Sequence, residues 1–134
     1  MSRATTHRSS EVEFNGKLLY TFTSNFIAAA ATSRFGHFTA PCDGKIRMLG
    51  RDITTVATHA TNNLSFGTLA DIDSHLNEVD ITDAVEGFVD YCTGIEGVEP
   101  LLDLDIVKGE TYAWGWVGGD TTGQLGTIIV IEPV

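Results

Sequence analysis

The sequence predicts a mainly β protein, built as a single β-sandwich or jelly-roll-like domain with one short helical insertion. Short segments rich in β-branched and aromatic residues recur along the chain, and turn signals separate them. The clearest are residues 111–117, which alternate aromatic side chains with smaller ones, and residues 127–131, which are β-branched throughout. About eight such strands joined by turns are typical of a sandwich or a jelly roll.

A β-hairpin is expected to open the fold. Residues 18–23 have the period-two pattern of a half-buried strand. The pair Asn15 and Gly16 is a strong tight-turn signal between this run and residues 11–14. Residues 28–31 could form one turn of helix, although the segments on both sides of them look extended.

Further strands are expected in the next part of the chain. Residues 34–39 look extended and end just before a proline, which disfavours helix in the residue ahead of it. A turn at residues 42–44 leads into a strand at 45–49. Residues 53–61 are rich in threonine and favour another strand. The two asparagines that follow are expected to end it, before a strand at residues 64–69.

The helical insertion is expected in the middle of the chain. Between residues 71 and 93 the charge is acidic and apolar residues recur at spacings of three to five, which favours a helix near residues 82–92. Asp80 or Thr82 would be its N-cap, and Gly94 suits its C-terminal end.

The last third returns to β signals. Strands are expected at residues 101–107, 111–117 and 127–131, with a turn at Lys108 and Gly109 between the first two. The final run lacks polar alternation, so it is expected to be a central strand covered on both faces.

Three aromatic residues, Tyr112, Trp114 and Trp116, share one face of an expected strand. Buried, they are core. Exposed, they could stack on sugar rings or anchor an interface, for which these residue types are enriched. The core interpretation is favoured, because strand spacing in a small domain usually points such a face inward.

Length and charge indicate one domain with two electrically different parts. A chain of 134 residues suits one domain, expected at residues 11–134 behind a basic N-terminal arm at residues 1–10. Residues 1–51 contain seven basic and three acidic residues, whereas residues 52–134 contain one basic and fifteen acidic residues. Such an acidic body repels nucleic acid and anionic lipid, so neither a nucleic-acid partner nor a membrane partner is expected.

The two cysteines, Cys42 and Cys92, allow one disulfide, but they lack the close spacing of a redox or zinc motif. Two reduced, half-buried thiols are favoured. The first residues contain no apolar signal core, and the longest run of small apolar residues is too short to cross a bilayer. We therefore expect synthesis in the cytoplasm, unless the protein leaves inside a particle.

No enzyme, cofactor or metal site is expected. The glycines between residues 115 and 126 lack the spacing of a phosphate-binding loop, and no nucleophile motif is present. The acidic pairs at 71/73 and 103/105 could begin a calcium site but lack the rest of one. The histidines at 37, 59 and 75 lack the close pair of a cupin metal site, so solvated or structural roles are favoured for both groups.

Three segments carry a resemblance to a known family. They run Phe-Thr-Ala-Pro-Cys-Asp-Gly-Lys-Ile at residues 38–46, Val-Lys-Gly-Glu-Thr-Tyr at 107–112 and Gly-Thr-Ile-Ile-Val-Ile at 126–131. Together they resemble the decoration, or cement, proteins of tailed-bacteriophage heads. The resemblance implies a jelly-roll-like protein on the outside of an expanded capsid, usually a trimer, that joins neighbouring major capsid subunits. It also implies a virion location after synthesis in the host cytoplasm.

The charge division suggests how such a protein would bind. The expected capsid-binding residues are Arg3, His7, Arg8 and Lys17 of the N-terminal segment. A competing interpretation is a carbohydrate- or receptor-binding module that uses the two tryptophans and the loop at residues 118–126. A third, a cupin-type enzyme, would require a bound metal.

Overall fold

The computed structural model describes residues 8–14, 17–28, 31–58, 61–94, 101, 104–119 and 123–134. These residues form ten strands and one 3-10 turn, so the chain is mainly β, as the sequence predicts. The elements are β1 (Arg8–Phe14), β2 (Lys17–Ile27), β3 (Ala31–Thr39), β4 (Gly44–Thr55), β5 (Asn62–Thr68), β6 (Leu76–Asp80), β7 (Gly87–Asp90), η1 (Tyr91–Thr93), β8 (Asp105–Ile106), β9 (Thr111–Gly118) and β10 (Gln124–Pro133). In the described part of the chain, no helix is both long and apolar enough to span a membrane.

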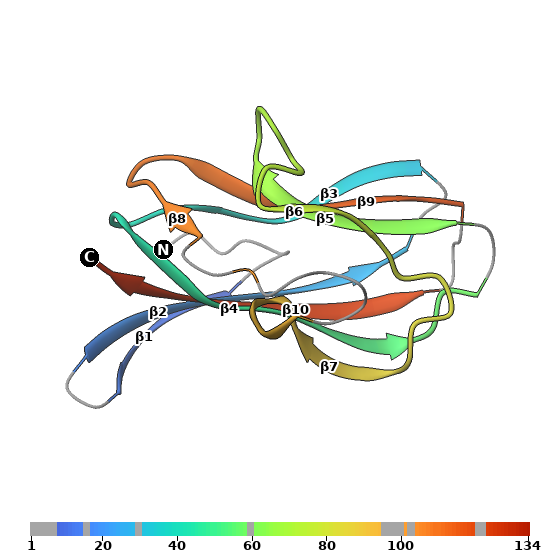
Figure 1. Cartoon of the computed structure of the whole chain (residues 1–134), viewed down its shortest axis with the longest axis horizontal. Helices are drawn as coiled ribbons and strands as arrows, with labels where there is room; N and C mark the ends of the chain where they lie inside the picture. Colours follow the sequence, from blue (N-terminus) through green and yellow to red (C-terminus); the bar gives the residue numbers. More distant parts are fainter. Residues whose placement is uncertain are drawn as a thin grey trace.

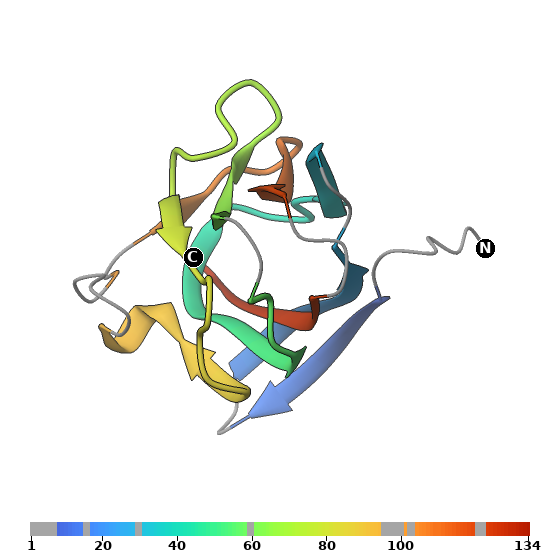
Figure 2. The ribbon, with the colours of Figure 1, turned by 90° about the vertical axis from the view of Figure 1, so that its right-hand side faces the viewer.

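The strands form two antiparallel sheets that pack face to face (Figure 1). One sheet has the order β1-β2-β10-β4-β7, with β8 also paired to β4, and the other has the order β3-β9-β5-β6. Seen end-on, the two sheets enclose a common interior (Figure 2). The β-sandwich prediction is therefore confirmed.

The connections give the sandwich a jelly-roll arrangement. Each of the successive pairs β2/β3, β4/β5, β6/β7 and β9/β10 places one strand in each sheet. In addition, β2 pairs with β10 and β3 pairs with β9, so the first pair and the last pair of strands wrap around the barrel side by side. Such wrapping of strand pairs is the jelly-roll solution for closing a double sheet.

The core is a layer of aromatic and aliphatic side chains from both sheets. Phe22 of β2 stacks on Phe38 of β3 with ring centroids 4.3 Å apart, and Phe26 stacks on Phe35 at the same separation. Stacked rings across the two sheets add geometric specificity to the burial of apolar area. This layer fixes which face of each strand points inward.

A loop covers part of the outer face of the four-stranded sheet. It joins β5 to β6, and it lies so close to Gly67 that a Cβ there would come 2.3 Å from the carbonyl oxygen of Asp71. A Cβ at Gly115 would similarly lie 2.9 Å from the side chain of Ile72. Because a glycine inside a strand lets another segment approach closely, this face is partly closed.

Several expected elements are confirmed. The N-terminal hairpin forms with Phe14 paired to Lys17, although the turn residues between them lie outside the described residues. The extended segments expected at 34–39, 45–49 and 111–117 lie within β3, β4 and β9. The turn at Lys108 and Gly109 is also present, and Gly109 has the positive φ of 87° that favours glycine.

Other expected elements differ. The threonine-rich strand ends at Thr55 rather than continuing to residue 61, and Asn62 and Asn63 begin β5 instead of interrupting the chain. β3 already includes Ala31, so no helical turn occupies that residue, and residues 29 and 30 lie outside the described residues. Of the described residues in the strand expected at 101–107, β8 covers only Asp105 and Ile106, and residues 102 and 103 lie outside the described residues.

The helix expected at residues 82–92 is reduced to the 3-10 turn η1, because β7 occupies most of its second half. Asp83 has a φ of 60° and Gly87 a φ of 112°, which interrupt any helix there. β7 instead pairs with the edge of β4. Asp90 is the N-cap of η1, and Gly94, in a left-handed conformation, ends it as expected.

β10 is central in its sheet but is not covered on both faces, which corrects the sequence interpretation. Its inward residues, among them Ile129 and Ile131, are at most 1% exposed. Its outward residues, including Ile128 and Val130, are only half-buried, because no second layer covers this face in the described structure. Half-buried apolar residues on an outer sheet face resemble an interaction surface more than a core.

Candidate functional site: the outer face of the six-stranded sheet

Of the four basic residues expected to bind a capsid, the two that the structure describes lie apart. Arg3 and His7 lie outside the described residues. Arg8 begins β1 opposite Thr23, whereas Lys17 begins β2 opposite Phe14 at the other end of the same hairpin. A strand advances about 3.3 Å per residue, so the hairpin places Lys17 roughly 20 Å from Arg8 along the strand direction. The last three residues of the expected arm are therefore part of a strand.

The aromatic stripe on β9 is part of the core. Tyr112, Trp114 and Trp116 are each at most 1% exposed and pack between the sheets. The Tyr112 hydroxyl accepts a hydrogen bond from the backbone N–H of Val107 at 2.9 Å. Burial raises the pKa of this phenol, so it stays protonated. The core interpretation is confirmed, and these rings offer no exposed face on which a sugar could stack.

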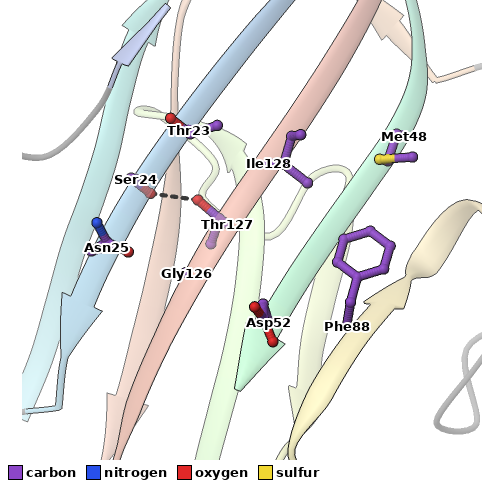
Figure 3. A pocket seen from close by; sticks show the side chains of 9 residues that line it. All are labelled: Thr23, Ser24, Asn25, Met48, Asp52, Phe88, Gly126, Thr127 and Ile128. Carbon is purple, nitrogen blue, oxygen red and sulfur yellow. Dashed lines mark hydrogen bonds between the residues drawn. The ribbon is translucent and has the colours of Figure 1, made fainter. Parts of the chain in front are cut away.

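A groove lies instead on the outer face of the six-stranded sheet. Its centre is a row of cross-strand neighbours: Asn25 on β2, Gly126 on β10, Asp52 on β4 and Phe88 on β7. Figure 3 shows Asn25 and Asp52 on either side of Gly126, with Phe88 beyond Asp52. The register thus puts an amide, a bare stretch of backbone, a carboxylate and an aromatic ring side by side.

Apolar residues from the next rows extend the groove. Ile128 pairs with Gly50, and Val130 pairs with Met48. The Phe88 ring lies over Gly50. A Cβ at residue 50 would come 2.3 Å from a ring carbon, so the ring can lie here only because residue 50 is glycine. The whole groove encloses about 490 Å³. Nine residues line it: Thr23, Ser24, Asn25, Met48, Asp52, Phe88, Gly126, Thr127 and Ile128.

The floor of the groove is held by a buried hydrogen bond. Ser24 and Thr127 are each 6% exposed, and their hydroxyls bond one another between β2 and β10, as Figure 3 shows. A satisfied pair of this kind removes the cost of burying two hydroxyl groups. It also fixes the register that places Asn25 beside Gly126.

Among the residues that the structure describes, Asp52 is the only charged one that lines the groove. It is exposed and forms no ion pair or hydrogen bond with any side chain that the structure describes. Neither a histidine nor a cysteine is among the lining residues. Chemically, the arrangement can bind a cationic or hydrogen-bond-donating group beside an aromatic ring.

Other polar groups do not form a metal site within the described residues, where no three histidine, cysteine or acidic side chains are grouped. Asp71 and Asp73 do approach each other, and the hydrogen bond that protonated Asp73 donates to the Asp71 carboxylate raises the pKa of Asp73. His75 bonds Ser74 through Nδ1 and the Asp105 carbonyl through Nε2. The acidic residue at 103 and the histidine at 59 lie outside the described residues.

The cysteines are unpaired, as expected, and both are half-buried. Burial raises the pKa of Cys92 to about 11, with a further contribution from the Asp90 carboxylate, and burial also raises the pKa of Cys42. Only the thiolate is reactive, so both residues should react slowly at pH 8. We expect a thiol-reactive dye to titrate two thiols per chain without reductant, and quickly only in denaturant. Fewer than two thiols in denaturant would contradict this assignment.

No protein-family model and no curated protein matches the sequence. Two solved structures, however, share this jelly-roll class of β-sandwich. The acid-stable capsid structure of Helicobacter pylori bacteriophage KHP30 contains a chain that is similar with a TM-score of 0.57 and 7% sequence identity, over 94% of this chain and 92% of that chain. A chain in the capsid asymmetric unit of cyanophage Pam1 gives a TM-score of 0.51 and 9% identity, over 100% of this chain and 91% of that chain. The chain therefore has a β fold that occurs in phage capsids, which confirms the resemblance at the level of fold.

Proposed function

We propose that this chain is a structural protein of a phage virion, a decoration protein that binds the outer surface of the head and stabilises contacts between major capsid subunits. The observation that carries the proposal is the whole-chain fold match, because it covers at least 91% of each capsid chain and nearly all of this one. The role is structural and not enzymatic. The protein would reach the head from the host cytoplasm, where it is synthesised.

The charge of the body supports a position on the outside of the head. Residues 52–134 contain fifteen acidic residues and one basic residue. Packaged nucleic acid is a dense polyanion, and it would repel this body from the interior of a filled head. The outer surface imposes no such repulsion.

The basic N-terminal residues would provide an electrostatic contact, through Arg3, His7 and Arg8 of the tethered segment and through Lys17 at the start of β2. A short tethered segment binds at high local concentration once the body has docked, so each additional contact raises the overall affinity. A trimer would present three such segments to the capsid, which multiplies the effect. Sedimentation equilibrium of the purified chain checks the trimer.

Deletion of Met1–Ser10 is expected to weaken binding to expanded phage heads that lack their decoration protein. Co-sedimentation should give saturable binding of the full chain, with an affinity at least tenfold higher than that of the truncated chain at low salt. This difference should shrink as salt screens the arm. Because residues 8–10 belong to β1, a matched variant that lacks only the first seven residues separates loss of the arm from damage to the hairpin.

Equal affinity of the full chain and both truncated chains would remove the arm from the mechanism. Absence of saturable binding by all three would remove the decoration role itself.

A further inference from the structure

Resting on the proposed function, we propose that the groove on the six-stranded sheet is a second capsid contact, and that its occupant is an extended segment of the major capsid protein with an arginine side chain. The guanidinium group would pair with Asp52 and lie against the Phe88 ring. The stem of the side chain would lie over Gly126.

Charge complementarity identifies the occupant as a cation. Asp52 is the only charged residue among the described ones that line the groove, and no described cationic side chain pairs with it. The carboxylate of Asp52 accepts two parallel N–H groups, a geometry that arginine matches. The Asn25 carbonyl oxygen, across Gly126 from Asp52, can accept a further N–H.

The exposed aromatic ring gives a second reason for choosing arginine. Phe88 is 49% exposed although it lies against Gly50, so one part of the ring is packed and another part is open to solvent. A planar guanidinium group can stack on such a ring, because its positive charge is attracted to the electron-rich face of the ring. Ile128 and Met48, both half-buried, continue the apolar surface for a neighbouring side chain of the same segment.

The groove is open at Gly126, and the fold itself does not require a glycine there. Its φ is not positive, and a Cβ there would meet only the Asn25 side-chain oxygen at 3.2 Å and the Ser24 carbonyl oxygen at 3.5 Å. Asn25 is exposed and can move by the few tenths of an ångström required. Glycine inside a strand often marks the close approach of another backbone or a ligand. A larger side chain at position 126 would therefore fit the fold, but it would fill part of the groove.

The test uses a small probe and the full chain, so that it does not depend on phage heads. Amide resonances are followed by NMR while N-acetyl-arginine N-methylamide is added. The citrulline analogue, which has nearly the same shape without the charge, is the matched control probe. We expect saturable shifts at Asp52, Phe88 and Gly126 with the arginine probe, and at least tenfold weaker binding of the citrulline probe.

Three variants locate the contact. Asp52→Asn and Gly126→Val are each expected to weaken binding of the arginine probe at least tenfold, and Phe88→Leu about threefold to tenfold. Asp83→Asn removes an exposed carboxylate outside the groove and should leave binding unchanged. Circular dichroism checks that each variant is folded. Equal binding of both probes, unchanged binding by Asp52→Asn, or no shift at the groove would overturn the proposal.

The same NMR experiment also tests whether the chain's own N-terminal segment occupies the groove. If removal of residues 1–7 shifts the free-chain resonances of Gly126 and Phe88, the chain's own N-terminal segment occupies the groove and the capsid assignment is wrong.

Co-sedimentation completes the test on heads. Asp52→Asn is expected to lower the affinity for heads, whereas Asp83→Asn is not. Probe binding without any binding to heads would reject the decoration role and leave the cation site, and binding to heads unaffected by Asp52→Asn would reject this contact alone.

Discussion

Replacement of Trp114 by alanine is expected to lower the free energy of unfolding by about 3–5 kcal/mol, which is typical for loss of a fully buried tryptophan. The side chain is 0% exposed and packs between the two sheets, with its ring centroid 5.2 Å from that of Phe66 and 6.4 Å from that of Phe35. Alanine would leave a large cavity in the centre of the aromatic layer. Urea denaturation followed by circular dichroism measures the change.

Trp114→Phe is the matched control. The indole Nε1–H is buried and donates no hydrogen bond within the described structure, so phenylalanine removes an unsatisfied donor while it keeps most of the ring. We expect a loss of about 1.5 kcal/mol or less. A loss as large as that of the alanine variant would show that the indole nitrogen has a partner.

Replacement of Arg51 by alanine is expected to be similarly severe, at about 3–5 kcal/mol. This arginine points into the interior from β4 and is 2% exposed. Its Nη1 donates to the carbonyl oxygens of Gly87 at 2.7 Å and Val85 at 3.3 Å, and so ties the start of β7 to the sheet. Loss of the guanidinium leaves two backbone carbonyls without their charged donor.

Arg51→Met separates packing from hydrogen bonding, because methionine fills much of the space without any donor. We expect an intermediate loss of stability, together with faster amide exchange in β7 and a change in the Phe88 resonances, since Phe88 belongs to the strand that Arg51 holds. A variant as stable as the original chain, with unchanged exchange in β7, would mean that these hydrogen bonds contribute no net stability.

Most residues of the candidate site cannot be predicted from the sequence. The spacing of Phe88 from other apolar residues predicts a helix, whereas the structure places it in β7. The sequence predicts Asp52 between two expected strands and Gly126 at the end of a glycine-rich loop. These residues, 74 positions apart, become neighbours only through the pairing of β10 with β4. Only the structure extends the last strand back to Gln124 and so puts Gly126 inside it, where a glycine often marks a close approach.

The sequence by itself determined the β-rich class, the N-terminal hairpin and the inward face of β9, because period-two alternation and turn residues act within a few positions of one another. Only the tertiary structure decided the strand order, the conversion of the expected helix into β7 and the open outer face of β10. These depend on contacts between distant segments. The edge of β4 offers backbone partners to β7, Arg51 holds β7 there, and no described segment covers the outer face of the sheet. A run of β-branched residues suits a strand covered on one face or on both, so the pattern alone could not reveal the groove.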